Sequence, residues 1–574
     1  MPKMTGWEAV VAGLKAEGVP YVFGLPGDPG HLLDALRLAE PDGGPRMVGV
    51  RFEASGAFMA MAYARVSGTM AACFGPPGPG VASMVSGVLE AFSGCTPMLV
   101  IGVRASRATN GMGAFQEADH VGIMRPITKW ATTVELPERI PWTIRRAAQI
   151  AREGQPGPVY VELPGDIGPG TWSIPVYERA PAIAPPAPNP EAVHAAALRL
   201  KAAKAPVMVL GGGAYAAGAG EAAAALAEQF GVAILTTPAG RGTVAETHPM
   251  FCGLVGLYRT ALPRKVYEDA DLLITVGSRM EEFQSKAFDY FPKGAALVQI
   301  DIEPFELGRN WRPDVAVQGD ARLALEAIRE AAAEVGAKKN ERRVGGIVIG
   351  RAAAIKDAQI DAEEALASGE MPLKGKSVVH AINEVFGENT IIVKENGGQD
   401  LWVYYWPYYQ VLNERCCVVP AEQTAMGYGV IGAMAAKLAA PDRQVVSVCG
   451  DGAFQMSMHE LGTAAQERLP VTWVVLNDGA LGWIQWIQKR KHEGRLVAST
   501  FSPGVDVVAI ARASGCEAVR VEAADQLLPA LRQAQAANAR GVPFVVDVPV
   551  DQMHHHAEFD RFHDLEPAAD AATA

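Results

Sequence analysis

The chain has 574 residues, of which 49% are hydrophobic and 20% charged, so it is long enough for three or four ordinary globular domains. Its formal net charge of −12 disfavours a nucleic-acid partner, because phosphate binding needs a basic surface, and favours a small-molecule ligand. The seven cysteines contain no CxxC pair, which disfavours a zinc site or a disulfide framework. With no long apolar leader or span, we expect a cytoplasmic protein without a membrane partner.

The first 180 residues alternate apolar, strand-like runs with stretches of helical spacing. This alternation predicts parallel strands joined by helices that cover both faces of each sheet, which is the α/β doubly wound class. The strand-like runs are residues 21–25, 47–52, 70–74, 98–102 and 159–163.

Two stretches interrupt the alternation and suggest domain boundaries. Residues 178–191 are rich in proline and are interpreted as a semi-rigid linker. The region from about 330 to 376 is rich in alanine and charged residues and is interpreted as a helical connection. We therefore expect three α/β domains with central parallel sheets, without an internal sequence repeat. The expected limits are 1–180 for the N-terminal domain, 190–335 for the central domain, 370–550 for the C-terminal domain and 551–574 for a C-terminal tail.

An aspartate between two glycines, Asp451, follows the apolar run 445–449, and helical spacing resumes directly after it. A second apolar run, 471–476, ends in "NDG". A parallel strand, helix, strand unit brings both strand ends to one sheet edge, so we expect Asp451 and Asp478 to converge there. Two carboxylates beside free helix amides suit a divalent hard cation that bridges to phosphates. The simpler alternative is a pair of unrelated turns after strands.

The stretch "GDGAFQMSMHELGTAAQERLPVTWVVLND" (450–478) resembles the thiamine diphosphate motif of the acetohydroxyacid synthase and pyruvate decarboxylase superfamily. Within it, the chain looks closest to acetolactate synthase large-subunit proteins. The resemblance implies thiamine diphosphate and Mg²⁺ as cofactors, and pyrimidine-binding, central and diphosphate-binding domains in that order. It implies Asp451, Asp478 and the backbone carbonyl of Ala480 as metal ligands. Asp478 stands where the family has asparagine, which retains an oxygen ligand and adds a negative charge.

Further segments resemble family signatures and imply the roles of three more residues. The resemblance implies that Glu53 touches the cofactor's aminopyrimidine, that Met426 wedges under its thiazolium ring, and that Gln116 orients oxygen-bearing intermediates. Each residue also has a structural alternative: Glu53 as a favourable charge at a helix start, Gln116 as a loop cap and Met426 as ordinary core. The segments are 22–27, 51–68, 78–92, 113–130, 397–402 and 424–433. The cofactor-binding residues that the resemblance implies are Pro26, Gly27, Glu53, Ser83, Gln399, Thr424, Met426, Gly450, Asp451, Gly452, Ala453, Asn477, Asp478, Ala480, Leu481 and Gly482.

The third candidate catalytic residue, beside Glu53 and Gln116, is Asp28 in "PGDPG". Acetohydroxyacid synthases usually have glycine at this place, while pyruvate decarboxylases have the acid. Asp28 either delivers a proton that releases an aldehyde or only bends the loop, and both alternatives stay open. Gly165 and Phe283 replace a lysine and an arginine of the family. These departures leave the choice of substrate open.

The resemblance implies an enzyme that decarboxylates a 2-oxo acid, with pyruvate as the expected donor, and ligates the remaining fragment to a second carbonyl compound. One alternative is a decarboxylase that releases an aldehyde, and another is a non-catalytic, cofactor-binding partner subunit. An oxalyl-CoA decarboxylase-like enzyme would need a basic nucleotide site that the sequence does not show. In this family the N-terminal domain of one chain faces the C-terminal domain of another, which implies a homodimer or homotetramer.

Two other motifs leave their function open. The glycine-rich turn in "VMVLGGGAYAAG" (207–218) is a weak dinucleotide signal, so binding of FAD is uncertain. The segment "MHHHAEFDRFH" (553–563) is interpreted as solvated histidines near a terminus, with a metal site or a flap over the active site as alternatives.

Overall fold

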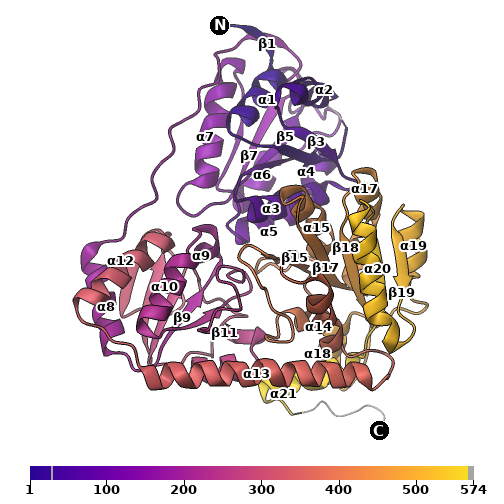
Figure 1. The fold of residues 1–574 in the computed structure, drawn as a ribbon. Coiled ribbons are helices and arrows are strands. Elements are labelled where there is room, and N and C mark those ends of the chain that lie inside the picture. The colour runs from indigo at the N-terminus through magenta and orange to yellow at the C-terminus, as the bar shows by residue number, and fades with distance from the viewer. Residues whose placement is uncertain (28–29, 567–574) are drawn as a thin grey trace. The chain divides into compact units, whose positions relative to one another are not determined.

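The computed structural model describes residues 1–27 and 30–566, so Asp28 lies outside the described residues. The described chain forms two compact units: residues 1–184 with 420–441 and 459–469, and the remainder. Within these ranges there are three six-stranded sheets, all parallel, and one small two-stranded sheet (Figure 1). The predicted α/β class with central parallel sheets is confirmed. The exact domain limits stay a prediction.

The first unit is built on a sheet with the strand order β3-β2-β4-β5-β7-β6. Helices α1 (Gly6–Ala16), α2 (Gly30–Ala39) and α7 (Ile140–Arg152) share one core with Val22 and Phe74 of the sheet. Because side chains alternate along a strand, the other face is left for α3 (Glu53–Ser67), which packs on β2 and β4. The strands are β2 (Tyr21–Gly24), β3 (Arg46–Gly49), β4 (Ala71–Phe74), β5 (Met98–Arg104), β6 (Trp130–Thr133) and β7 (Pro158–Pro164).

Two segments from late in the chain complete this unit. Helix α15 (Tyr428–Ala439) packs along α3, where the rings of Phe58 and Tyr428 meet edge to face at 5.9 Å. Helix α17 (Leu461–Gln466) follows Glu460, whose carboxylate accepts hydrogen bonds from the amides of Arg51 and Phe52 at 2.9 and 3.2 Å. The start of α3 is therefore fixed by residues some 400 positions away.

The second unit contains the two other parallel sheets. The central sheet has the order β11-β10-β9-β12-β13-β14, and the C-terminal sheet has the order β16-β15-β17-β18-β20-β19. The central strands are β9 (Pro206–Leu210), β10 (Ala233–Thr236), β11 (Phe251–Leu254), β12 (Leu272–Val276), β13 (Ala296–Asp301) and β14 (Val315–Gln318). The C-terminal strands are β15 (Thr390–Lys394), β16 (Cys417–Val418), β17 (Gln444–Gly450), β18 (Thr472–Asn477), β19 (Glu517–Arg520) and β20 (Phe544–Pro549).

The first and third large sheets share one strand order, although the sequence shows no repeat. Numbered within each sheet, both run 2-1-3-4-6-5. The order reverses between β2 and β4 in the first sheet and between β15 and β17 in the third. Open α/β sheets bind ligands at such a switch point, outside the carboxyl ends of the strands. Each sheet therefore offers one ligand-binding edge.

The connections agree with the sequence interpretation. Residues 174–189 form neither helix nor strand. The alanine-rich region contains the whole of α13 (Glu341–Ala367), the long salmon helix of Figure 1, which packs on α11 (Ala261–Glu268) and α14 (Gly375–Phe386). Across the described ranges, no helix combines the length and the apolar character that crossing a bilayer requires.

A fully buried ion pair lies inside the second unit. The guanidinium of Arg241 donates to both carboxylate oxygens of Glu246, at 2.5 and 2.9 Å, and to the carbonyl oxygens of Val403 and Tyr409. Glu246 also accepts from the amide of Val411 at 2.8 Å, and both charged side chains are 0% exposed. This pair ties the turn after β10 to the segment that follows β15.

We expect Arg241→Met to destabilise the protein by about 3–5 kcal/mol, because it leaves the Glu246 carboxylate buried without a counter-charge. Urea unfolding followed by circular dichroism measures this. Lys265→Met is the control, since the Lys265–Asp269 pair is 75% and 61% exposed and should contribute less than about 1 kcal/mol. Equal effects of the two substitutions would contradict the expectation.

Candidate functional site

Two acids lie at the ends of neighbouring strands of the C-terminal sheet. Strand β17 runs through Gly450 into α16 (Asp451–Ser457), and Asp478 directly follows β18. The parallel register pairs Gly450 with Leu476, so both strands end at the same edge of the sheet. The structure thus brings Asp451 and Asp478 together next to the switch point between β15 and β17, as their spacing predicts.

Burial makes this pair electrostatically unusual. It raises the pKa of Asp451 to about 7, and the negative charge of Asp478 adds to the effect. Burial also raises the pKa of Asp478 to about 6, although hydrogen bonds from Gln399, the Ala480 amide and Gln552 oppose the shift. Two carboxyls in contact away from water retain a proton unless a cation replaces it. The raised pKa values therefore favour binding of a cation by the two acids.

The loop 478–482 that carries Asp478 is held in a fixed shape. Ala480 forms an isolated antiparallel bridge with Thr500, flanked by hydrogen bonds from the Leu481 amide to Ser499 at 2.9 Å and from the Phe501 amide to Gly479 at 2.8 Å. Among the hydrogen bonds of the described residues, none is accepted by the Ala480 carbonyl. That carbonyl is available as the third ligand that the sequence predicts.

Two glycines of the site, Gly482 and Gly450, leave room for different groups. A Cβ on Gly482, the first residue of α18 (Gly482–Lys491), would lie 2.5 Å from Asp478 Oδ2, so a side chain there would displace the carboxylate. A Cβ on Gly450 would meet nothing within 4 Å. The backbone before Asp451 therefore faces open space, as a phosphate-binding turn requires.

Gln399 connects a third strand end to the pair. It begins the 3₁₀ helix η5 (Gln399–Val403) beyond β15, is 3% exposed, and donates through Nε2 to Asp478 Oδ2 at 3.3 Å. Its Oε1 is buried without a hydrogen-bond partner among the described residues. An oxygen acceptor suits a water molecule bound to a cation better than an anionic diphosphate oxygen.

Asn477 is engaged within the protein. Its Nδ2 group donates to Asp547 Oδ1 at 3.0 Å, and its Oδ1 accepts from the Gly479 amide at 3.2 Å. Gly452, Ala453 and Leu481 lie around the start of α16, where a Cβ on Gly452 would come within 2.8 Å of the Leu481 side chain. Asn477 thus shapes the turn, and direct cofactor contact by these residues stays a prediction.

The histidine-rich segment is not solvated, and that interpretation is wrong. Residues 552–563 form helix α21 (Gln552–His563), in which His555, His556 and His563 are 1%, 6% and 4% exposed. The helix packs its aromatic face on Trp483, whose ring lies 5.0 Å from that of Phe559. His556 Nε2 donates to the Gly482 carbonyl at 3.1 Å, and burial lowers the pKa of His556 to about 4. This helix therefore contacts the Asp478 loop with a neutral imidazole.

The first unit places Glu53 at the start of α3, where it is 8% exposed. A Cβ built on Gly80, in α4 (Pro79–Ser83), would lie 3.2 Å from Glu53 Oε1. Ser83 ends the same helix and is half-buried. The turn at Gly80 therefore lies close to the Glu53 carboxylate. A larger residue at position 80 would push the turn and the carboxylate apart.

Met426 lies in a turn that a buried acid holds, a contact that sequence analysis missed. Glu90, on α5 (Val85–Ser93) and 0% exposed, accepts hydrogen bonds from the amides of Ala421 and Ala425, the latter at 3.0 Å. Burial raises the pKa of Glu90. Thr424, in the same turn, has a left-handed backbone conformation with a φ of 53°. The signal in the sequence is a single charge in the apolar run "GVLEAF", whose partner lies more than 300 residues away.

Gln116 lies in the loop after β5 with a φ of 58° and is half-buried. The adjacent Glu117 accepts hydrogen bonds from the amides of Gly111, Gly113 and Ala114, which lower its pKa. Glu117 is therefore the residue that caps this loop, which leaves the Gln116 side chain for another role.

Pro26 and Gly27 are exposed at the end of β2, where a Cβ on Gly27 would meet Pro76 at 3.2 Å. They lie on the same sheet edge as the turn that holds Gly80. Asp28, which follows them, is outside the described residues, so its two alternative roles stay open.

The residues of the second unit fit a diphosphate and a divalent cation. Three features match that pair of groups: a buried acid in contact with a half-buried one, a buried amide oxygen without a partner among the described residues, and open space over Gly450. In the part of the chain that the structure describes, no cluster of three or more His, Cys, Asp or Glu side chains could hold a metal. A cation here would take two side-chain oxygens, with the other ligands from a carbonyl, water and the diphosphate.

Comparison with known families identifies the class. Three models match in chain order: "Thiamine pyrophosphate enzyme, N-terminal TPP binding domain" over residues 4–123, the central domain over 193–328 and the C-terminal TPP binding domain over 399–548. The chain belongs to the thiamine pyrophosphate enzymes and binds that cofactor.

Individual relatives narrow the comparison. A probable acetolactate synthase large subunit of Methanocaldococcus jannaschii is 31% identical over 563 residues, covering 96% of this chain and 92% of the relative. The acetolactate synthase large subunits of Parasynechococcus marenigrum and Corynebacterium glutamicum are 32% and 31% identical, each covering 95% of this chain, and 88% and 86% of the relatives. The similarity therefore extends over nearly the whole length.

The acid pair predicts a pH dependence of the metal-free protein. Because the folded-state pKa values of Asp451 and Asp478 are raised, the folded state binds more protons than the unfolded state, and stability falls as the pH rises from about 4 to about 7. Asp478→Asn removes the repulsion and should regain on the order of 2 kcal/mol at about pH 8.

Urea unfolding in EDTA at about pH 5 and about pH 8 measures this difference between parent and variant. Asp525→Asn, at an exposed position of the same unit, is the control and should follow the parent. A parent and an Asp478→Asn variant with the same pH dependence would show that the two acids do not interact.

Proposed function

We propose that the chain catalyses the Mg²⁺-dependent decarboxylation of pyruvate and the ligation of the remaining two-carbon fragment to a second pyruvate, which releases CO₂ and forms acetolactate. The observation that carries this proposal is the pair formed by the buried Asp451 and the half-buried Asp478 at the switch point of the C-terminal sheet. The names of the full-length relatives support the reaction, and the enclosed carboxylate of Glu53 supports catalysis.

When bound, thiamine diphosphate would supply a nucleophilic carbon for a 2-oxo acid and a place for the electrons that decarboxylation leaves. The protein's part is to place protons and charges. Asp451, Asp478 and the Ala480 carbonyl would hold Mg²⁺, and the open backbone at Gly450 would receive the diphosphate. Glu53 lies at a helix start, which favours its carboxylate form, and this carboxylate would accept the proton that it shares with the aminopyrimidine.

Met426 and Gln116 would position the cofactor and the second substrate, respectively. The turn that Glu90 holds fixes Met426 as the support for the cofactor's ring. Gln116, left free by the capping of its loop, orients the carbonyl oxygen of the second substrate. These roles rest on the resemblance together with the geometry of each loop.

Three finer properties belong to the same proposal. We infer a homodimer or homotetramer with active sites between chains, from the arrangement typical of the family. We expect the cytoplasm as location, from the cysteine pattern. Binding of FAD to the central domain stays open, and the flavin absorbance of the purified protein decides it.

Incubation of the purified protein with pyruvate, thiamine diphosphate and Mg²⁺, followed by identification of the products, tests the reaction. We expect acetolactate and CO₂, and we expect Glu53→Gln to lower kcat by about 10²–10⁴-fold, the usual contribution of a positioned acid or base. Glu191→Gln is the matched control, because Glu191 is an exposed acid in the first turn of α8 (Pro190–Ala202).

Each contrary result favours a different alternative. Acetaldehyde without acetolactate would replace the ligation by simple decarboxylation. A Glu53→Gln variant as active as the parent would remove Glu53 from the chemistry. Cofactor binding without any product would favour the non-catalytic partner subunit.

A further inference from the structure

A histidine of the first unit, His120, is buried with both ring nitrogens in use. It begins helix α6 (His120–Met124) and is 1% exposed. Its Nε2 lies 2.8 Å from the Gly78 amide nitrogen, and its Nδ1 lies 3.1 Å from Glu162 Oε2. A backbone N–H can only donate, so Nε2 accepts and the ring proton is on Nδ1, which donates to Glu162. His120 is therefore a neutral imidazole in one fixed tautomer.

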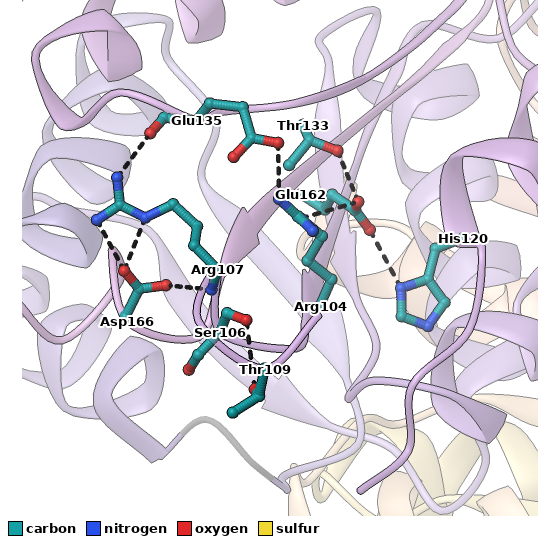
Figure 2. Close-up of polar contacts among 9 residues, drawn as sticks. All are labelled: Arg104, Ser106, Arg107, Thr109, His120, Thr133, Glu135, Glu162 and Asp166. Carbon is teal, nitrogen blue, oxygen red and sulfur yellow. Dashed lines mark hydrogen bonds and ion pairs between the residues drawn. The ribbon is translucent and has the colours of Figure 1, made fainter. Parts of the chain in front are cut away.

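Side chains from three strands surround the carboxylate of Glu162, which accepts the hydrogen bond from His120. Thr133, at the end of β6, donates to Oε1 at 2.7 Å, and Tyr160, on the same strand β7, donates to Oε2 at 2.9 Å. The guanidinium of Arg104, at the end of β5, lies 4.0 Å from Oε1. Figure 2 shows the Glu162 carboxylate between Thr133, Arg104 and His120. Surrounded by donors, it acts as an acceptor for the imidazole.

The turn that His120 holds lies between the two predicted catalytic side chains. Gly78 has a φ of 62°, and a Cβ on it would come within 2.9 Å of the Gln116 carbonyl oxygen and 3.0 Å of the Gln116 Cβ. Two residues later, a Cβ on Gly80 would lie 3.2 Å from Glu53 Oε1. One short turn thus comes close to Gln116 at one end and to Glu53 at the other.

We propose that His120 and Glu162 are positioning residues that set the distance between Gln116 and Glu53 by holding the Gly78 amide. This inference rests on the proposed function and extends it. Loss of the contact lets the turn move, which displaces Gln116 relative to Glu53. Ligation needs both residues, whereas decarboxylation needs Glu53, so the fraction of product that is ligated depends on His120.

Three variants at one position separate this role from mere packing. In His120→Gln the side-chain oxygen reaches the place of Nε2 and can still accept from Gly78. His120→Asn retains a group only near the place of Nδ1, and His120→Leu retains neither. Asp166→Asn is the control, since Asp166 pairs with Arg107 at the same sheet edge, at 2.7 Å, with both side chains about one-third exposed (Figure 2).

The first readout is amide hydrogen exchange at Gly78 in the cofactor-free protein. Losing one buried hydrogen bond should speed this exchange by about tenfold in His120→Asn and His120→Leu. His120→Gln and Asp166→Asn should match the parent. The second readout is the molar ratio of acetolactate to CO₂, which should fall several-fold in the Asn and Leu variants and recover in His120→Gln.

Two results would overturn the inference. One is unchanged Gly78 exchange and product ratio in His120→Leu. The other is a His120→Gln variant as defective as His120→Leu, with the same loss in unfolding temperature, which would mean that the ring only fills space. If the parent itself forms no product, the proposed function fails, while the exchange of Gly78 still decides whether His120 holds the turn.

Discussion

A buried carboxyl group, that of Asp451, lies beside a half-buried one, that of Asp478, at the ends of β17 and β18. Such a pair is costly unless a proton or a cation lies between its members. Three other parts of the second unit hold the pair in place. Gln399 of η5 donates a hydrogen bond to Asp478, the bridge to Thr500 fixes the loop 478–482, and α21 packs over Gly482. The same cost that would destabilise the metal-free protein would favour a metal between the two acids.

Much of this could be predicted from the sequence, because it depends on neighbours along the chain. A parallel strand, helix, strand unit must bring its two strand ends to one edge, so "GDG" and "NDG" suffice to bring Asp451 and Asp478 together. The place of Glu53 at a helix start is predicted in the same way, by a strand-like run followed by helical spacing, whereas its role comes from the family resemblance. The α/β class and the long helix near residue 350 also follow from local patterns.

What escaped prediction depends on contacts between distant segments. The common strand order of the first and third sheets is a property of packing, and the two stretches of sequence show no repeat that would predict it. Glu90 and His120 owe their roles to amides of Ala425 and Gly78, which no local pattern connects to them. The histidines of α21 were misjudged because nearness to a terminus predicts exposure, whereas the aromatic residues of that helix find partners in Trp402 and Trp483.

The central claim is that a divalent cation between Asp451 and Asp478 fastens the diphosphate of the cofactor. Isothermal titration of thiamine diphosphate into the protein, once with Mg²⁺ and once with EDTA, tests it most directly. The account predicts clear binding heat with Mg²⁺ and far weaker binding without it. Equal affinity in both titrations would contradict it.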